Sequence, residues 1–155
     1  MKDPIKYVLL LLKYRLRSES EIRTRMRVKG FNEEEIQKAL EFLRSEGLLD
    51  EKLLAEGLRD KYLYRGVSPR KIKQILRKTG IRSEIVESAM LGQELPEEEA
   101  LRIVEKITHG EKILDRKVFQ RVFNKLQYMG YSASEIFDLL KRNGIKLKLP
   151  DFREE

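Results

Sequence analysis

The sequence predicts an all-α protein of three tandem three-helix repeats, which form an elongated body that small rotations between repeats can curve. The first observation is a fixed period, since Gly30, Gly80 and Gly130 stand fifty residues apart. Apolar residues recur at matching positions around these glycines, namely Ile22, Ile72, Val122, Met26, Leu76, Leu126, Phe31, Ile81 and Tyr131. Such a period is typical of an internal repeat. Strand-like alternation is confined to the end of the chain.

The first repeat, residues 1–48, has a start signal for each of its three expected helices. A side-chain acceptor before the first turn satisfies a free backbone N–H, and a glutamate three residues later returns the bond in a capping box. Proline suits the first helical position because its missing N–H would be unpaired there. The signals are Asp3 before Pro4, Ser18 with Glu21, and Asn32 with Glu35.

The second repeat, residues 49–93, contains the most informative stretch of the chain. Ser68 is expected to cap a basic helix that begins at Pro69. Gly80 is expected in the left-handed conformation that closes this helix. The other two helices are expected after Asp50 and over residues 83–92.

The third repeat, residues 94–155, follows a linker at 92–96 that contains glycine and proline. Its helices are expected from Pro96 to about His109, around residues 118–126, and after the capping box Ser132 with Glu135. Beyond Gly144, apolar residues alternate with lysines. This tail is expected either to pack back as an extended strand or to stay loose.

Charge alternates along the chain in step with the repeats. The net charge is +7, but residues 59–82 hold nine cations against Asp60 alone, whereas residues 30–58 hold three cations and eight anions. Residues 83–111 are again acidic, and both ends of the chain are basic. Two interpretations stay open. The charges are solvated faces that pair with one another, or they form an interrupted basic track for a polyanion or an acidic partner.

The sequence offers no group of residues suited to catalysis or to holding a cofactor. It has no cysteine, and its single histidine, His109, is expected to support the carbonyls at a helix end. It also lacks a phosphate-binding glycine loop. The apolar run at residues 5–12 is far below the roughly 20 residues that a bilayer needs. We expect a cytoplasmic protein that is not an enzyme, binds no metal and does not enter a membrane.

The second and third helices of each repeat resemble a helix-turn-helix unit, because a glycine turn joins two amphipathic helices. In that motif the second helix enters the major groove and is expected to be basic. Here the cations lie on the first helix of each pair, and its partner is acidic in the first two repeats. Sequence-specific reading of duplex DNA is therefore disfavoured, while contact with phosphates along the central basic helix stays open.

Several motifs make the sequence similar to the RecX regulatory proteins of bacteria over nearly the whole chain. They are Arg17-Ser18 with Glu21-Ile22, Lys29-Gly30-Phe31, Gly47-Leu48-Leu49-Asp50, Ala55-Glu56, Arg65-Gly66-Val67-Ser68-Pro69-Arg70-Lys71-Ile72 and Lys78-Thr79-Gly80-Ile81. The resemblance implies a regulator that binds the RecA recombinase filament on single-stranded DNA. It also implies inhibition of ATP hydrolysis and strand exchange by RecA in recombination, DNA repair and the SOS response. Leu54 and Asp50 depart from the family pattern, which affects packing between repeats.

The resemblance carries over a basic motif and no catalytic residues. We expect a monomer whose cations contact the filament, namely Arg23, Arg25, Arg27, Lys29, Arg65, Arg70, Lys71, Lys73, Arg77 and Lys78. Direct contact with the single-stranded DNA stays open, as do the orientation and stoichiometry of binding. The rival interpretations are a free-standing nucleic-acid-binding protein without sequence preference and a purely structural adaptor.

Overall fold

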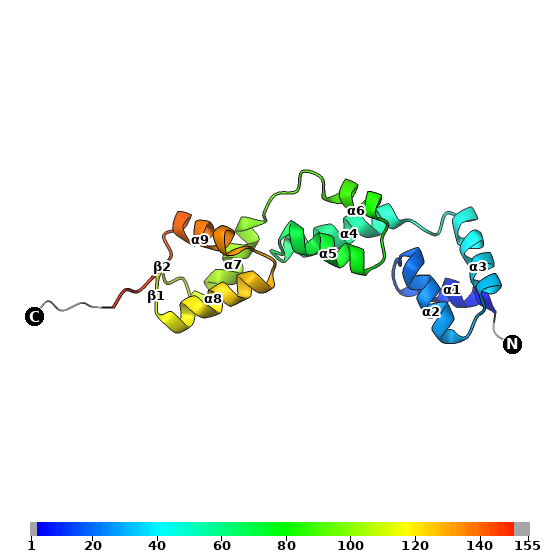
Figure 1. The fold of residues 1–155 in the computed structure, drawn as a ribbon, viewed down its shortest axis with the longest axis horizontal. Helices are drawn as coiled ribbons and strands as arrows, with labels where there is room; N and C mark the ends of the chain where they lie inside the picture. The colour runs from blue at the N-terminus through cyan, green and yellow to red at the C-terminus, as the bar shows by residue number, and fades with distance from the viewer. Residues whose placement is uncertain (1–2, 151–155) are drawn as a thin grey trace, which may run out of the picture. The chain divides into compact units, whose positions relative to one another are not determined.

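The computed structural model describes residues 3–150, and the regular structure of this part of the chain is almost entirely helical, which confirms the predicted all-α class (Figure 1). Its helices are α1 (Pro4–Tyr14), α2 (Glu19–Lys29), α3 (Glu33–Ser45), α4 (Glu51–Tyr64), α5 (Pro69–Lys78), α6 (Ser83–Met90), α7 (Glu97–Thr108), α8 (Arg116–Tyr128) and α9 (Ala133–Arg142). Two short strands, β1 (Ile113–Leu114) and β2 (Lys146–Leu147), form one sheet.

The chain divides into two compact units. The first unit consists of Met1–Lys61 with Ile72–Gly92, and the second consists of Tyr62–Lys71 with Gln93–Glu155. Helices α4 and α5 therefore each have residues in both units. The repeat boundaries expected from the sequence stay a prediction.

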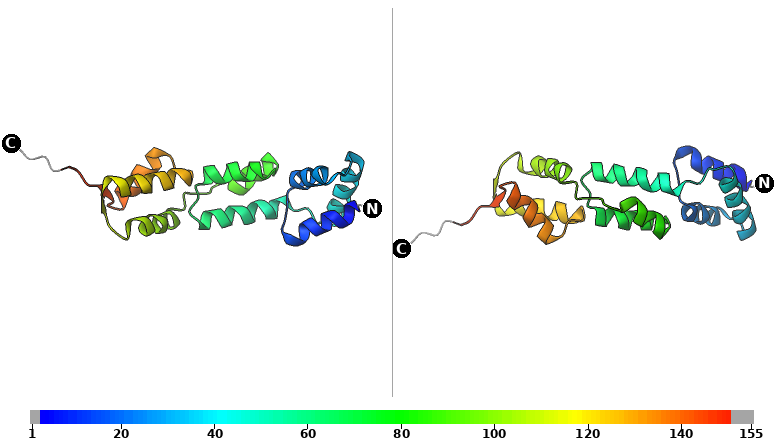
Figure 2. Two further views of the ribbon diagram at one scale, coloured as in Figure 1. Left: turned by 90° about the horizontal axis from the view of Figure 1, so that it is seen from below. Right: turned by 90° about the horizontal axis from the view of Figure 1, so that it is seen from above.

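In the first unit, α1, α2 and α3 pack around an apolar cluster and lie side by side in Figure 2. The cluster consists of Val8, Ile22, Met26, Phe31, Ile36, Ala39, Leu40 and Leu43. The capping boxes predicted for α2 and α3 are both confirmed, since Ser18 and Asn32 each exchange side-chain-to-backbone bonds with the glutamate three residues later. Local signals therefore start these helices, and burial of their apolar faces holds them together.

A buried carboxylate joins two helix starts within the first unit. Glu51, at the start of α4, is 8% exposed, and its Oε2 accepts a hydrogen bond from the backbone N–H of Glu19 at 3.0 Å. Its Oε1 accepts from the backbone N–H of Arg82 at 3.2 Å. Free N–H groups at helix starts attract negative charge. The Glu51 side chain thus accepts a hydrogen bond from one backbone N–H group at the start of α2 and from one at the start of α6.

Gly80 follows α5 in the predicted left-handed conformation, with φ of +87°. It also lies against the first turn of α2, because a β-carbon at Gly80 would stand 2.5 Å from the β-carbon of Ser20. Next to it, the Ser18 hydroxyl donates a hydrogen bond to the carbonyl of Thr79. We call this packing of a glycine turn on the start of the preceding basic helix the turn-to-start contact.

Gly130 makes the same contact inside the second unit. Its φ is +94°, and a β-carbon there would stand 2.5 Å from the β-carbon of Lys71. The backbone N–H of Ser68 donates to the carbonyl of Met129 at 2.9 Å. Ser68 follows Ser18 by fifty residues, as Gly130 follows Gly80. The period in the sequence is therefore matched by a contact that each unit contains.

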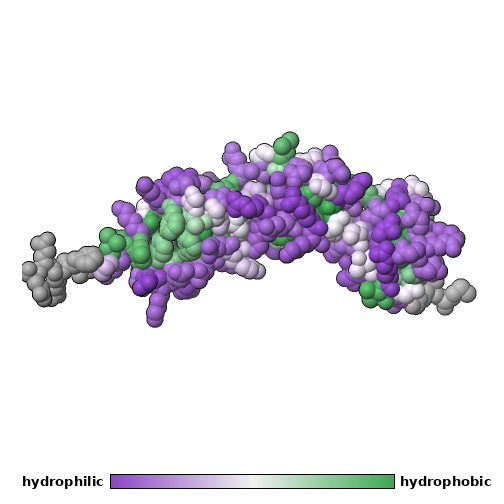
Figure 3. Space-filling model, viewed as in Figure 1, coloured by the Kyte–Doolittle hydropathy of each residue, from purple (hydrophilic) through white to green (hydrophobic). Residues whose placement is uncertain are grey.

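In the second unit, α7, α8 and α9 enclose a second apolar core. It consists of Ala100, Val104, Leu114, Val122, Leu126, Met129, Tyr131, Ile136, Leu139, Leu140 and Ile145. Phe137 is 53% exposed, and its ring centroid lies 5.5 Å from that of Phe123 and 6.4 Å from that of Phe119. Figure 3 shows a hydrophobic patch in the region of α8 and α9, bordered by hydrophilic side chains.

The tail after α9 pairs with the segment before α8. Strands β1 and β2 are parallel, and the backbone N–H groups of Lys146 and Lys148 donate to the carbonyls of Lys112 and Leu114 at 2.7 Å. An extended tail was one of the two expected outcomes, whereas β1 was not predicted. A two-residue strand is too short to show a period of two in the sequence.

Glu21 and Glu135 make the free energy of unfolding depend on pH. Burial raises the pKa of each carboxyl, but hydrogen bonds to Glu21 from Arg15 and Ser18, and to Glu135 from Ser132 and Arg70, outweigh it, so both pKa values lie below the usual value of a glutamate. Groups with a lowered folded pKa stabilise the fold above the unfolded value, and this stabilisation is lost as the pH falls through the folded pKa.

We therefore expect the free energy of unfolding, measured by chemical denaturation, to fall as the pH drops below about 4.5. Replacing both Glu21 and Glu135 with glutamine should make this fall shallower. An identical pH profile in the double variant would contradict the assignment.

Candidate nucleic-acid interface

Five of the ten cations predicted to form the interface are paired with carboxylates. The pairs are Arg23 with Glu19 (3.7 Å), Arg27 with Glu33 (2.7 Å), Arg70 with Glu135 (3.3 Å), Lys73 with Glu87 (3.2 Å) and Arg77 with Glu87 (2.8 Å). Hydrogen bonding from Lys73, reinforced by Arg77, holds the pKa of Glu87 below its usual value. Exposed pairs of this kind are worth about 0–1 kcal/mol. An anion that binds these cations more tightly can therefore displace the carboxylates.

Three further predicted cations lie near aromatic rings. Lys29 and Arg65 are each 5.9 Å from a ring centroid, of Tyr7 and Tyr62 respectively. Lys71 Nζ is 3.7 Å from the ring centroid of Tyr128, and it also donates to the backbone carbonyl of that residue. These cation–π contacts orient the side chains without neutralising them.

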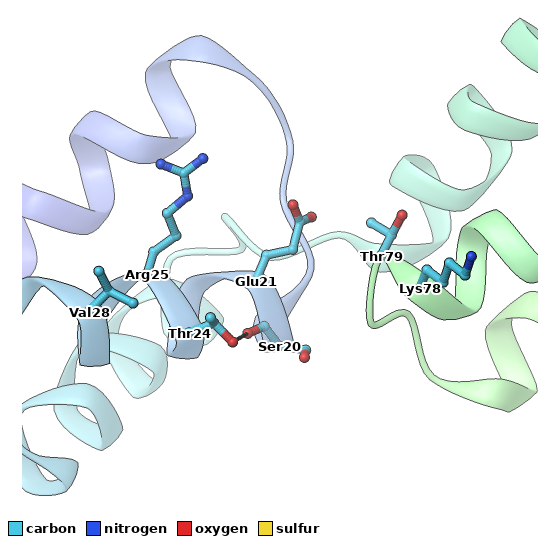
Figure 4. Close-up of a pocket in the computed structure, with 7 residues that line it drawn as sticks. All are labelled: Ser20, Glu21, Thr24, Arg25, Val28, Lys78 and Thr79. Carbon is cyan, nitrogen blue, oxygen red and sulfur yellow. Dashed lines mark hydrogen bonds between the residues drawn. The ribbon is translucent and has the colours of Figure 1, made fainter.

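The remaining two cations, Arg25 and Lys78, are exposed, and the described part of the chain gives neither an ion pair. Arg25 comes from α2 and Lys78 from the end of α5, and both line a hollow of about 440 Å³ in the first unit (Figure 4). The structure thus brings together one cation from each of the first two basic helices. The other predicted site residues do not line this hollow.

The hollow is open to solvent, and polar side chains contribute to a lining whose surface is mainly apolar. Its other lining residues are Ser20, Glu21, Thr24, Val28 and Thr79. Thr24 and Thr79 donate their hydroxyls to the carbonyls of Ser20 and Ile75, at 3.1 and 2.8 Å. Glu21 is bound by Arg15 at 2.5 Å, which leaves the two cations as the charges available to a partner. The arrangement suits an anionic group such as a phosphate or a carboxylate.

The cations of α8 were not predicted as site residues. This helix carries Arg116, Lys117, Arg121 and Lys125, and it contains no acidic residue. All four side chains are exposed. The sequence does show four cations without an acid over residues 116–128. The net charge counted over residues 112–155 hides them, because that count includes the acidic residues of the tail and of α9.

Within residues 3–150, no cluster of histidine and acidic residues could hold a metal ion. None of the helices in that range has both the length and the apolar character that a membrane crossing needs. His109 ends α7 in a left-handed conformation, with φ of +54°, and its backbone N–H donates to the carbonyl of Glu105.

Comparison with known proteins places these features in a family. Residues 6–43 match the family domain described as "RecX, first three-helix domain". A regulatory protein RecX of a Mycobacterium species (strain KMS) is 30% identical over 142 residues, which cover 86% of this chain and 78% of that protein. The regulatory protein RecX of Vibrio campbellii is 29% identical over 127 residues, which cover 81% and 82% of the two chains.

Solved structures agree on the fold. The crystal structure of RecX from Lactobacillus salivarius matches with a TM-score of 0.70 and 23% identity, over 90% of this chain and 93% of that one. A second structure, described as regulatory protein RecX, matches with a TM-score of 0.69 and 24% identity, over 90% and 70% of the two chains. The relatives are named as regulatory proteins rather than enzymes. The chain therefore belongs to the RecX family of regulatory proteins.

Proposed function

We propose that this protein binds the RecA recombinase filament on single-stranded DNA as a monomer and inhibits ATP hydrolysis and strand exchange. Membership of the RecX family supports the regulatory role. The proposal includes three tandem repeats, at residues 1–48, 49–93 and 94–155, each contributing a basic helix. It describes a cytoplasmic protein that has no catalytic activity or cofactor of its own.

The proposal depends mainly on the positions of Arg25 and Lys78, two cations that line the same hollow. Eight of the ten cations predicted for the interface have a carboxylate or a ring partner within their own unit. Arg25 and Lys78 are exposed and without an ion pair in the described residues, and they come from successive basic helices. Such a pair is available to a phosphate of the DNA or a carboxylate of a RecA subunit without breaking an existing bond.

Replacing Arg25 and Lys78 together with glutamine is expected to weaken inhibition of RecA about tenfold, because two exposed contacts of up to about 1 kcal/mol each are lost. The measurement is DNA-dependent ATP hydrolysis by RecA, titrated with the variant at two salt concentrations. The matched control replaces Lys6 and Lys13 with glutamine, because both are exposed cations of α1 outside the hollow. Equal inhibition by wild type, variant and control would remove the hollow from the interface.

The central cations test a different point. Arg70 forms an ion pair with Glu135, and Arg77 forms one with Glu87. Lys71 donates a hydrogen bond to the backbone carbonyl of Tyr128. Their replacement with alanine therefore disturbs contacts inside the units as well as any contact with the filament. The two glutamine substitutions at Arg25 and Lys78 are the cleaner test.

A free-standing nucleic-acid-binding protein is the second candidate function. The exposed cations of α8, which lack acidic neighbours on their own helix, favour it. Co-sedimentation with RecA filaments, compared with bare single-stranded DNA at the same salt concentration, separates the two. Retention by bare DNA as strong as by the filament would favour the second candidate.

A further inference from the structure

Helix α8 carries a row of cations along one face. Lys117, Arg121 and Lys125 are spaced by four residues, which places them one above the next on a helix. Tyr128 follows on the same side, three residues after Lys125. All four side chains are exposed. We call these four residues the α8 stripe.

The charge of the α8 stripe is available to a partner. In the described residues Lys117, Arg121 and Lys125 form no ion pair, and α8 itself has no acid. The central helix α5 is equally rich in cations, but Lys73 and Arg77 there share Glu87 as a partner. The α8 stripe therefore presents three cations without a carboxylate partner, whereas Arg70, Lys73 and Arg77 of α5 each have one.

Tyr128 adds an aromatic surface at the end of this row. Its side chain is 71% exposed, and Lys71 Nζ and Lys125 Nζ lie 3.7 and 5.6 Å from the ring centroid. Both lysines belong to the second unit, as Tyr128 does. Two ammonium groups thus lie near the ring, while most of the Tyr128 side chain stays open to solvent.

We infer that the α8 stripe binds single-stranded nucleic acid directly. Lys117, Arg121 and Lys125 would contact consecutive stretches of the phosphate backbone, and Tyr128 would stack against a base. Cations that follow the backbone, combined with aromatic rings that stack on bases, are the features by which proteins hold single strands without sequence preference. In a duplex the base faces are stacked on each other, so Tyr128 could not reach them.

An acidic protein segment would use the three cations but would gain little from the ring. The exposed Tyr128, flanked by lysines, is therefore what favours a nucleic acid over an acidic protein. The inference rests on the proposed function, which supplies a single strand, and deepens it by assigning a direct contact with that strand.

The test uses the full chain and a labelled oligothymidine of about twenty nucleotides, without RecA, in a fluorescence anisotropy titration. Replacing Lys117, Arg121 and Lys125 with glutamine is expected to weaken binding at least tenfold. It should also flatten the log–log salt dependence by about two units, because each phosphate contact on a single strand contributes about 0.7. A matched control replaces Arg102, Lys106 and Lys112, three exposed cations of the same unit, with glutamine.

Tyr128 is tested separately. Tyr128→Phe keeps the ring and should bind the oligonucleotide like the wild type, whereas Tyr128→Leu should weaken binding several-fold, because base stacking is lost. A competition titration with duplex DNA of the same length should show weaker binding for the duplex.

Equal losses for the α8 triple variant and its control would overturn the inference, since net charge alone would then explain binding. So would a wild-type protein that binds no bare oligonucleotide, even if it still inhibits RecA, and that result would leave the proposed function intact. If the α8 variant loses inhibition of RecA while bare strands are never bound, the stripe contacts protein instead. Loss of bare-strand binding with unchanged inhibition supports the inference and separates it from the hollow.

Discussion

Replacing Gly80 with alanine is expected to lower the free energy of unfolding by about 3 kcal/mol. The left-handed backbone accounts for about 1 kcal/mol of this loss, because a side chain disfavours a φ of +87°. The remainder comes from crowding, since the new β-carbon would stand 2.5 Å from Ser20 Cβ and 2.7 Å from Ser20 Oγ. Overpacking of this kind typically costs about 1–3 kcal/mol.

The matched control is Gly47→Ala. Gly47 also has a positive φ, of +67°, but a β-carbon there would meet nothing within 4 Å. We expect a loss of only about 1 kcal/mol for this variant. Chemical denaturation followed by far-UV circular dichroism measures both. Equal losses at the two positions would mean that α2 moves away from Gly80 at little cost, and that the turn-to-start contact is loose.

Replacing Glu51 with alanine is expected to cost about 3 kcal/mol. Its carboxylate accepts hydrogen bonds from two backbone N–H groups, those of Glu19 and Arg82. Each bond to a charged group contributes about 1.5–3 kcal/mol, and removing the acceptor leaves both donors without a partner. Part of this cost is recovered if water reaches the two N–H groups, which is why the expected loss lies at the lower end of the summed range of about 3–6 kcal/mol.

Two further variants make the Glu51 test specific. Glu51→Gln keeps the shape, but its amide offers an N–H₂ group where one of the two backbone donors points, so most of the loss should remain. Glu56→Ala removes another acid from α4, one with no bond to a helix start, and should change the free energy of unfolding by less than about 0.5 kcal/mol. A Glu51→Gln variant as stable as the wild type would show that the carboxylate is not needed.

The local parts of the fold could be read from the sequence. Capping boxes and closing glycines act within four or five residues, so the starts of α2, α3 and α9 and the turn at Gly80 follow from short motifs. The role of Glu51 and the pairing of β1 with β2 could not be read in this way. Both join segments about thirty residues apart, and no local pattern encodes which ones meet.

The candidate site was predictable in outline and not in detail. Arg25 and Lys78 were among the expected contacts, but nothing in the sequence distinguishes Lys78 from Arg77 next to it. The structure separates them, because Arg77 reaches Glu87 whereas Lys78 lines the hollow. Counting charge over residues 59–82 also finds only Asp60 as an acid, yet Glu87 and Glu135 supply partners from outside that segment.

The turn-to-start contact has a direction, because the glycine always belongs to the later segment and the receiving helix start to the earlier one. Such a head-to-tail contact joins two different surfaces, so each segment keeps one surface free for a further segment, whereas a contact between two identical surfaces uses both of them up. Duplication of a repeat could therefore lengthen the array without inventing a new interface. The register changes at α8, where Val118 stands fifty residues after Ser68. Val118 lies inside the first turn of α8, and Asp115 caps this helix in place of a serine.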